Sequence, residues 1–234
     1  PLHDDNALAG AQLAFGRPVA THYDLEQADV VLSLDSDFLA TDGNNLRNAR
    51  KWAKRRAAPK PGQPLPRLYV VESTFSTTGT VADHRFRLRS SDVPALVFAL
   101  ANALGVAKGG DLERELGAHS PAAFVKGNKN WLEIVAKDLQ RARGKSAVVV
   151  GPQQPPVVHA VVHAINEALG NHGQTVQHTA VADGMEQSSV ASIRELATAI
   201  QEGTADTVVF LDSNPVYDAP AELKFGELLR TRKP

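Results

Sequence analysis

The sequence contains no cysteine, one methionine and few aromatic residues, which make up 6% of the chain. Without cysteine it cannot form disulfides, thiolate zinc sites or cysteine-ligated iron–sulfur clusters. No apolar stretch approaches the roughly 20 residues that a membrane-spanning helix needs. The formal net charge of −1 provides no field of one sign that would attract nucleic acid or a membrane surface. These absences are typical of a globular protein. Because the chain has no cysteine, the sequence gives no indication of its redox compartment.

Several sequence motifs of nucleotide and hydrolase sites are also missing. The sequence has neither G-x-G-x-x-G nor a Walker motif, and it has no G-x-S-x-G. An ordinary nucleotide cofactor held by such a loop is therefore not expected. A basic run from Arg47 to Lys60 predicts a solvated helix face rather than a nucleic-acid surface.

A ten-residue pattern is present twice. It reads Ala-Asp-x-Val-x-x-Leu-Asp-Ser-(Asp or Asn) and covers residues 28–37 and 205–214. In each copy a β-branched and apolar run predicts a buried strand, at 30–34 and at 207–211, and the polar residues that follow predict a turn. We interpret the two copies as a repeat of one strand-to-helix turn, and the second copy as the strand around which the chain is organised.

The rest of the chain alternates between strand and helix patterns. The order predicts an α/β fold with two Rossmann-like three-layer lobes and mostly parallel sheets. The first lobe would cover residues 1–110 and the second residues 111–234, because the pattern weakens in a glycine-containing stretch between them. The other predicted strands are 68–71, 85–89, 147–150 and 175–179. The predicted helices are 6–15, 46–57, 93–104, 130–143, 156–169, 190–202 and 223–229.

The candidate ligand-binding residues lie in loops that follow predicted strands, where open α/β sheets bind their ligands. The carboxylates Asp35 and Asp212 can accept hydrogen bonds from a ribose or a guanine edge, and Asn214 can both donate and accept. The alternative is that such side chains only cap turns and helices. No catalytic residue is assigned. The candidate set is Asp35, Ser36, Glu72, Ser73, Thr74, Gly151, Gln153, Asp212 and Asn214.

Two histidines, His159 and His163, stand four residues apart on a predicted helix, a spacing that can bind zinc. The helix is broadly apolar and no third ligand is evident in the sequence. Packed or surface histidines are therefore the favoured interpretation, and no metal ligand is assigned.

Three stretches of the sequence resemble the molybdopterin oxidoreductase family, the dimethyl sulfoxide reductase and formate dehydrogenase group. Residues 70–96 are similar to that family's strand, polar turn, Ala-Asp step and capped helix. Residues 164–173 resemble its Ala-x-Asn to Leu-x-Gly-Asn-x-Gly segment, and residues 214–220 resemble its Gly-x-Asn-Pro turn. The resemblance implies two related Rossmann-like lobes, each holding the guanosine half of a molybdopterin guanine dinucleotide.

The chain departs from that family at the turns that would meet the cofactor. It has Asp35 in a turn where the family commonly has Gly-x-Asn, Glu72-Ser73-Thr74 where the family has Asp-Pro-Arg, and Asp212 before Asn214 in place of glycine. Carboxylates at these turns would repel a diphosphate. Details such as residues 33–39 and 153–159 resemble one branch, the large iron–sulfur subunit of alternative complex III, whose molybdopterin-type domain is thought to carry no molybdenum.

The resemblance implies a fragment of such a subunit, a cofactor-free scaffold in a respiratory quinol-oxidising complex. Iron–sulfur clusters would then lie only in flanking sequence, since this chain has no cysteine to bind them. The start at Pro1 and the stop near a predicted helix end lead us to expect a piece of a longer protein. Its partners would be the remaining domains of the polypeptide and other subunits of a membrane-associated complex, in the periplasm or at the membrane, without nucleic acid or direct membrane insertion. The alternatives are a true dinucleotide-binding domain of a molybdoenzyme and a stand-alone module for a small ligand or protein.

Overall fold

The computed structural model describes residues 5–57, 65–106, 122–182 and 188–232. It divides into two compact units. One unit consists of Asn6–Ala180, and the other combines Val181–Pro234 with Pro1–Asp5. No helix of the described part of the chain has the length and apolar character needed to cross a membrane.

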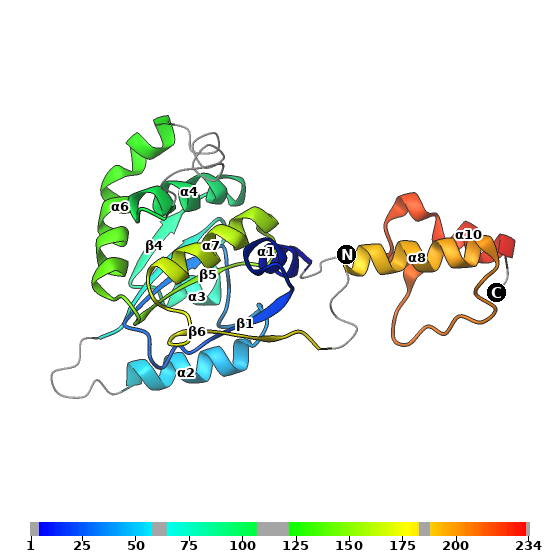
Figure 1. Ribbon diagram of the computed structural model, residues 1–234, viewed down its shortest axis with the longest axis horizontal. Helices are drawn as coiled ribbons and strands as arrows, with labels where there is room; N and C mark the ends of the chain where they lie inside the picture. Colours follow the sequence, from blue (N-terminus) through cyan, green and yellow to red (C-terminus); the bar gives the residue numbers. More distant parts are fainter. Residues whose placement is uncertain (1–4, 58–64, 107–121, 183–187, 233–234) are drawn as a thin grey trace. The chain divides into compact units, whose positions relative to one another are not determined.

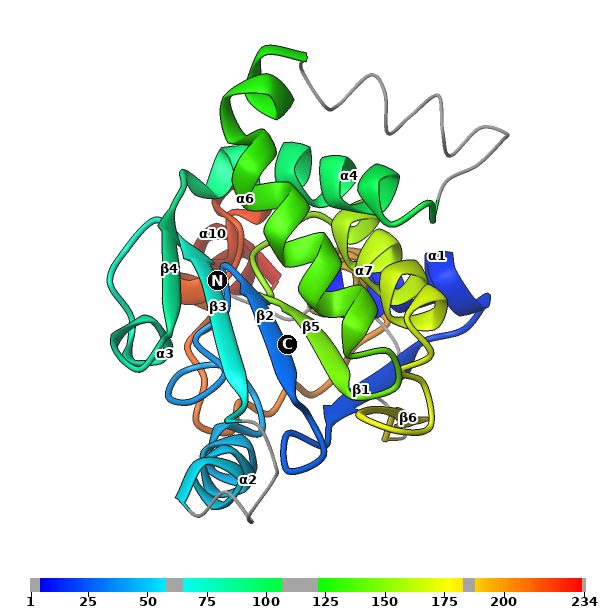
Figure 2. The same ribbon diagram turned by 90° about the vertical axis from the view of Figure 1, so that its left-hand side faces the viewer.

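A four-stranded sheet forms the centre of the unit Asn6–Ala180 (Figure 2). Its strands are β2 (Val30–Leu34), β3 (Arg67–Glu72), β4 (His84–Arg87) and β5 (Ser146–Val150). They follow the order β4-β3-β2-β5, and each neighbouring pair is parallel. Leu34 is in register with both Val71 and Val150, so β2, β3 and β5 end together at one edge of the sheet.

Helices cover both faces of this sheet, which gives three layers (Figure 1). Leu32 on one face belongs to a core built with α4 (Val93–Ala103), α6 (Ala122–Arg141) and α7 (Pro156–Ala168). Val31, which points the other way, shares a core with Trp52 of α2 (Asn45–Ala57). Every residue of β2 is buried, as a parallel strand covered on both faces requires. The predicted α/β Rossmann-like fold is confirmed.

A separate two-stranded ribbon lies beside the main sheet. The strand β1 (Val19–Tyr23) pairs antiparallel with β6 (Val176–Ala180), so that Val19 faces Ala180. The sequence predicted β6 but not β1, whose Thr21 and His22 interrupt the apolar pattern that marks a strand. The helix α1 (Asp5–Phe15) precedes β1, and a short helix α3 (Thr77–Thr80) and the 3-10 helix η1 (Ser90–Asp92) follow β3 and β4.

The compact units differ from the lobes that the sequence suggested. The strand β5, which follows the predicted boundary at residue 110, pairs with β2, which precedes it. Residues on both sides of that boundary therefore build one sheet. The stretch at 107–121, in which the boundary falls, lies outside the described residues.

The other unit is helical in its described part. It contains α8 (Ser189–Glu202), α9 (Pro215–Asp218), the 3-10 helix η2 (Ala221–Leu223) and α10 (Phe225–Arg232). Its small core is centred on Ala197, Ile200 and Phe225.

The prediction of a buried strand at 207–211 is wrong. Those residues have no regular structure, and Val209 and Leu211 are 72% and 81% exposed. A strand needs a neighbour to satisfy its backbone groups, and none of residues 188–232 forms one.

Candidate functional site at the carboxyl edge of the sheet

A pocket of about 300 Å³ lies where the strands of the main sheet end. The loop after β2 lines one side, the loop after β3 lines another, and Gln153 enters from the loop after β5. This is the place at which an open parallel sheet offers a ligand site. The lining residues are Asp35, Ser36, Asp37, Thr41, Asp42, Glu72, Thr74, Phe75, Ser76 and Gln153.

Asp35 joins the loops around the pocket. Its backbone adopts the left-handed conformation, with φ of 54°, which aspartate tolerates better than most residues. Its buried carboxylate accepts hydrogen bonds from the Ser90 hydroxyl and from Gln154 Nε2, the latter at 2.8 Å. Its carbonyl oxygen accepts from Gln153 Nε2. A Cβ on Gly151 would lie 1.8 Å from that same carbonyl oxygen, so only glycine allows the loops to approach this closely.

Glu72, at the end of β3, is similarly engaged within the protein. Its carboxylate accepts from the Ser76 hydroxyl at 2.5 Å and forms an ion pair with Arg85 of β4. Glu72 is only 4% exposed, and a Cβ on Gly79 would lie 1.9 Å from its Oε1. The tight packing of Glu72 against Ser76, Gly79 and Arg85 holds the loop 73–80 against the sheet.

Two more carboxylates line the pocket from the loop after β2. Asp37 accepts from both the backbone N–H and the hydroxyl of Thr78, at 2.9 Å and 2.6 Å. Asp42 accepts from the Ser36 hydroxyl at 2.6 Å. Burial raises the pKa of the Asp42 carboxyl above its usual range, although the hydrogen bond from Ser36 opposes that change. Hydroxyl donors of the chain thus occupy this side of the pocket too.

The structure brings together five of the nine residues that the sequence singled out, namely Asp35, Ser36, Glu72, Thr74 and Gln153. Gly151 does not line the pocket, but its backbone lies in close contact with that of Asp35. Ser73 is exposed on the same loop but does not line the pocket. A role in binding stays a prediction for all of these residues.

The remaining two candidates, Asp212 and Asn214, belong to the other compact unit. Both are exposed, and Asp212 adopts a left-handed backbone with φ of 47°. Asn214 lines a cavity of about 330 Å³ within that unit, together with the apolar side chains of Ile193 and Phe210. It therefore lies in a mainly apolar groove, not at the end of a strand.

The pocket at the carboxyl edge does not suit a diphosphate. Four of its lining residues are carboxylates, and no lysine or arginine is among the described residues that line it. Arg85, the nearby cation, is paired with Glu72 and lies over the Phe75 ring, 4.6 Å from the ring centroid. A pyrophosphate would meet negative charge on several sides, with no positive side chain among the described lining residues to offset it.

Several residues of this region were missed by sequence reasoning. Ser90 and Gln154 complete the hydrogen bonds of Asp35, but they lie 55 and 119 residues from it in the chain.

A cluster of three histidines elsewhere in the same unit was missed as well. The sequence paired His163 with His159, but in the structure His163 lies close to His172 and His178. For His172, the only signal in the sequence was its position just after a helix end, and His178 carried none.

Comparisons with known proteins identify the fold and no more. No family model matches the sequence, and no curated protein matches it. Among solved structures, acetylene hydratase from Pelobacter acetylenicus is similar, with a TM-score of 0.53 and 14% sequence identity. The likeness covers 73% of this chain and 25% of that protein, so this chain spans about a quarter of its neighbour's length. It shows that the chain shares an α/β Rossmann-like fold with part of a much larger enzyme.

Proposed function

We propose that this chain is part of a molybdopterin oxidoreductase-type subunit and serves there as a Rossmann-like scaffold that holds no pterin nucleotide. Two lines of support point to that superfamily. The sequence motifs at 70–96, 164–173 and 214–220 resemble it. Acetylene hydratase, an enzyme of the molybdopterin family, is a structural neighbour of this chain.

The observation that carries the cofactor-free part of the proposal is the acidic pocket at the carboxyl edge. Its carboxylates are bound by donors of the chain itself, which are Ser36, Thr78, Ser76, Arg85 and Gln154 with Ser90. A guanine nucleotide would have to replace these contacts and bring further negative charge beside them. The loops are therefore better suited to holding each other in place than to holding a dinucleotide.

In this proposal the subunit belongs to a respiratory quinol-oxidising complex of the alternative complex III type. Electrons would pass through iron–sulfur clusters in other parts of the polypeptide, since this chain has no cysteine to bind them. Its partners would be those other domains and neighbouring subunits of a membrane-associated complex, in the periplasm or at the membrane. The support for these finer points is the sequence resemblance described above.

Metal analysis of the full-length protein tests the proposal directly. We expect no stoichiometric molybdenum or tungsten after purification from cells that supply both metals. One molybdenum or tungsten per chain would overturn the cofactor-free assignment and favour a functional dinucleotide-binding domain.

Titration with guanosine diphosphate tests the pocket itself. We expect no saturable binding to this chain at millimolar nucleotide. Two lysine substitutions test whether the missing positive charge prevents nucleotide binding. Thr74→Lys places a cation in the pocket lining, whereas Thr77→Lys places one nearby but outside the lining. Thr74→Lys should bind the nucleotide measurably more tightly than Thr77→Lys. Saturable binding by the unmodified chain would contradict the proposal.

A further inference from the structure

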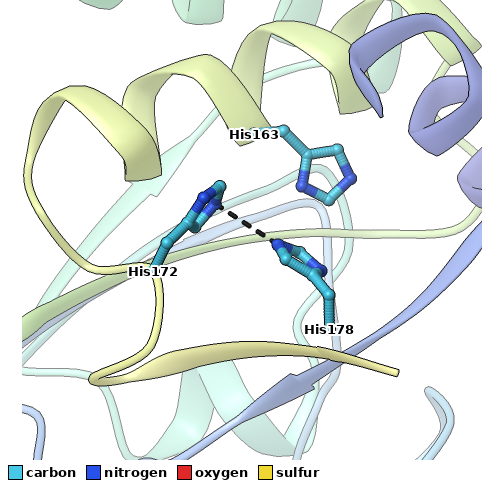
Figure 3. Close-up of side chains that lie close together, drawn as sticks. All are labelled: His163, His172 and His178. Carbon is cyan, nitrogen blue, oxygen red and sulfur yellow. Dashed lines mark hydrogen bonds between the residues drawn. The ribbon is translucent and has the colours of Figure 1, made fainter. Parts of the chain in front are cut away.

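Three histidines converge in the unit Asn6–Ala180, away from the pocket described above (Figure 3). His163 comes from α7, His172 from the loop that follows it, and His178 from β6. One ring nitrogen of each lies within 4.8 Å of the corresponding nitrogens of the other two. The Nε2 atoms of His172 and His178 are 3.3 Å apart.

The outer nitrogens of two of these rings have partners that orient them. His172 Nδ1 lies 2.6 Å from a Glu167 carboxylate oxygen, and His178 Nδ1 lies 3.3 Å from the Thr21 hydroxyl. In metal sites a ligating histidine typically gives its second nitrogen to a carboxylate, carbonyl or similar acceptor, which fixes the tautomer and turns the other nitrogen toward the ion. Glu167 and Thr21 are placed to do this for His172 and His178.

The third ring has an unsatisfied nitrogen. His163 is 7% exposed, and its Nδ1 is buried with no hydrogen-bond partner among the described residues. A buried polar atom left unpaired costs free energy that a bound ion would recover. His163 therefore differs from a histidine that only fills space in the core.

Apolar surroundings shield the three rings from solvent on one side. The Phe15 ring at the end of α1 packs against all three imidazoles, with centroid distances of 4.9, 5.9 and 4.7 Å to His163, His172 and His178.

We propose that His163, His172 and His178 bind one Zn²⁺ ion. Three imidazole nitrogens with no coordinating carboxylate select a borderline transition metal over Mg²⁺ or Ca²⁺, which prefer oxygen. Three protein ligands leave one tetrahedral position for solvent or a small anion. The ion would link α7 to the ribbon of β1 and β6, which contact each other through these rings. The proposal does not depend on the function proposed above.

The test uses the purified chain without a polyhistidine tag, stripped of metal and titrated with Zn²⁺ at pH 7.5. Calorimetry should give one site per chain, and thermal denaturation should show a higher midpoint with Zn²⁺. Replacement by Co²⁺ should give the visible absorption of a tetrahedral site. Weak binding without defined stoichiometry would leave only a hydrogen-bonded histidine cluster and would overturn the proposal.

Substitutions identify the ligands. His172 and His178 are half-buried, so His172→Ala and His178→Ala are the variants best placed to keep the fold, which circular dichroism verifies. Each should weaken Zn²⁺ binding by on the order of 100-fold or more, and Glu167→Gln by about 10-fold, as expected for a lost outer partner. The exposed His84 of β4 supplies the control, because His84→Ala should bind like the unmodified chain. Unchanged affinity in a folded His178→Ala variant would contradict the assignment.

Discussion

The two copies of the ten-residue pattern share a turn but not a strand. Asp35 and Asp212, at the same place in the pattern, both adopt the left-handed backbone, with φ of 54° and 47°. The apolar run before Asp35 is the fully buried strand β2, whereas residues 207–211 before Asp212 are irregular and largely exposed. The left-handed turn is therefore set locally, whereas the strand depends on its neighbours.

Each copy meets a different environment. The strand β2 has β3 on one side and β5 on the other, in register over its whole length. Among the described residues 188–232 no strand is available to residues 207–211. Without a partner strand, the backbone N–H and C=O groups of residues 207–211 must form hydrogen bonds with water. Most of these residues are therefore exposed to solvent.

The largest expected effect comes from truncating equivalent leucines. Leu34 of β2, the counterpart of Leu211 in the pattern, is fully buried, so Leu34→Ala should lower the free energy of unfolding of its unit by about 3–4 kcal/mol. Leu211 is 81% exposed, and Leu211→Ala should change the stability by less than about 0.5 kcal/mol. Urea denaturation followed by tryptophan fluorescence suits the first variant, since both tryptophans lie in the sheet unit. Equal losses would remove the distinction between the two copies.

Acid should weaken the sheet unit through the buried histidine His159 of its helix α7. Burial lowers the pKa of His159 on α7 to about 4. Between that value and the ordinary 6.5 the unfolded chain binds a proton that the folded chain does not, so the free energy of unfolding falls as pH falls through this window. The contribution of His159 to this loss is about 3 kcal/mol, and that contribution grows little below pH 4.

The variant His159→Leu isolates this contribution. With a chelator present to remove metal, its free energy of unfolding should depend less steeply on pH between 6.5 and 4 than that of the unmodified chain. The exposed His84 supplies the comparison, since His84→Leu should keep the original slope. Parallel pH profiles for His159→Leu and the unmodified chain would show that His159 titrates normally.

The smallest expected effect compares glycine at the two turns. Glycine suits a left-handed backbone, so the substitution isolates the side chain. Asp35→Gly should cost about 2 kcal/mol because the Ser90 hydroxyl loses its acceptor and the buried Gln154 Nε2 loses the carboxylate among its acceptors. Asp212→Gly should leave the stability unchanged within about 0.5 kcal/mol. Matched denaturation curves measure both, and a similar cost at Asp212 would point to contacts of its carboxylate that the turn alone does not explain.

The sequence anticipated most elements of the sheet unit because their signals are local. The buried runs of β2, β3 and β5 and the amphipathic helices α2 and α7 lie where their patterns predicted them. It missed β1, whose pairing with β6 joins residues about 157 positions apart, as between Thr21 and His178. Part of the candidate pocket was also within reach of sequence reasoning, since Asp35, Glu72 and Gln153 each follow a strand.

The amino-acid sequence determined the turns at Asp35 and Asp212, because backbone preference and side-chain polarity act over a few residues. Only the tertiary structure decided which copy of the pattern became a strand, since backbone hydrogen bonding needs a partner strand. It also decided which histidines meet: His163 of α7, His172 of the following loop and His178 of β6 converge in the folded chain. That convergence depends on contacts between elements, which no spacing along the chain encodes.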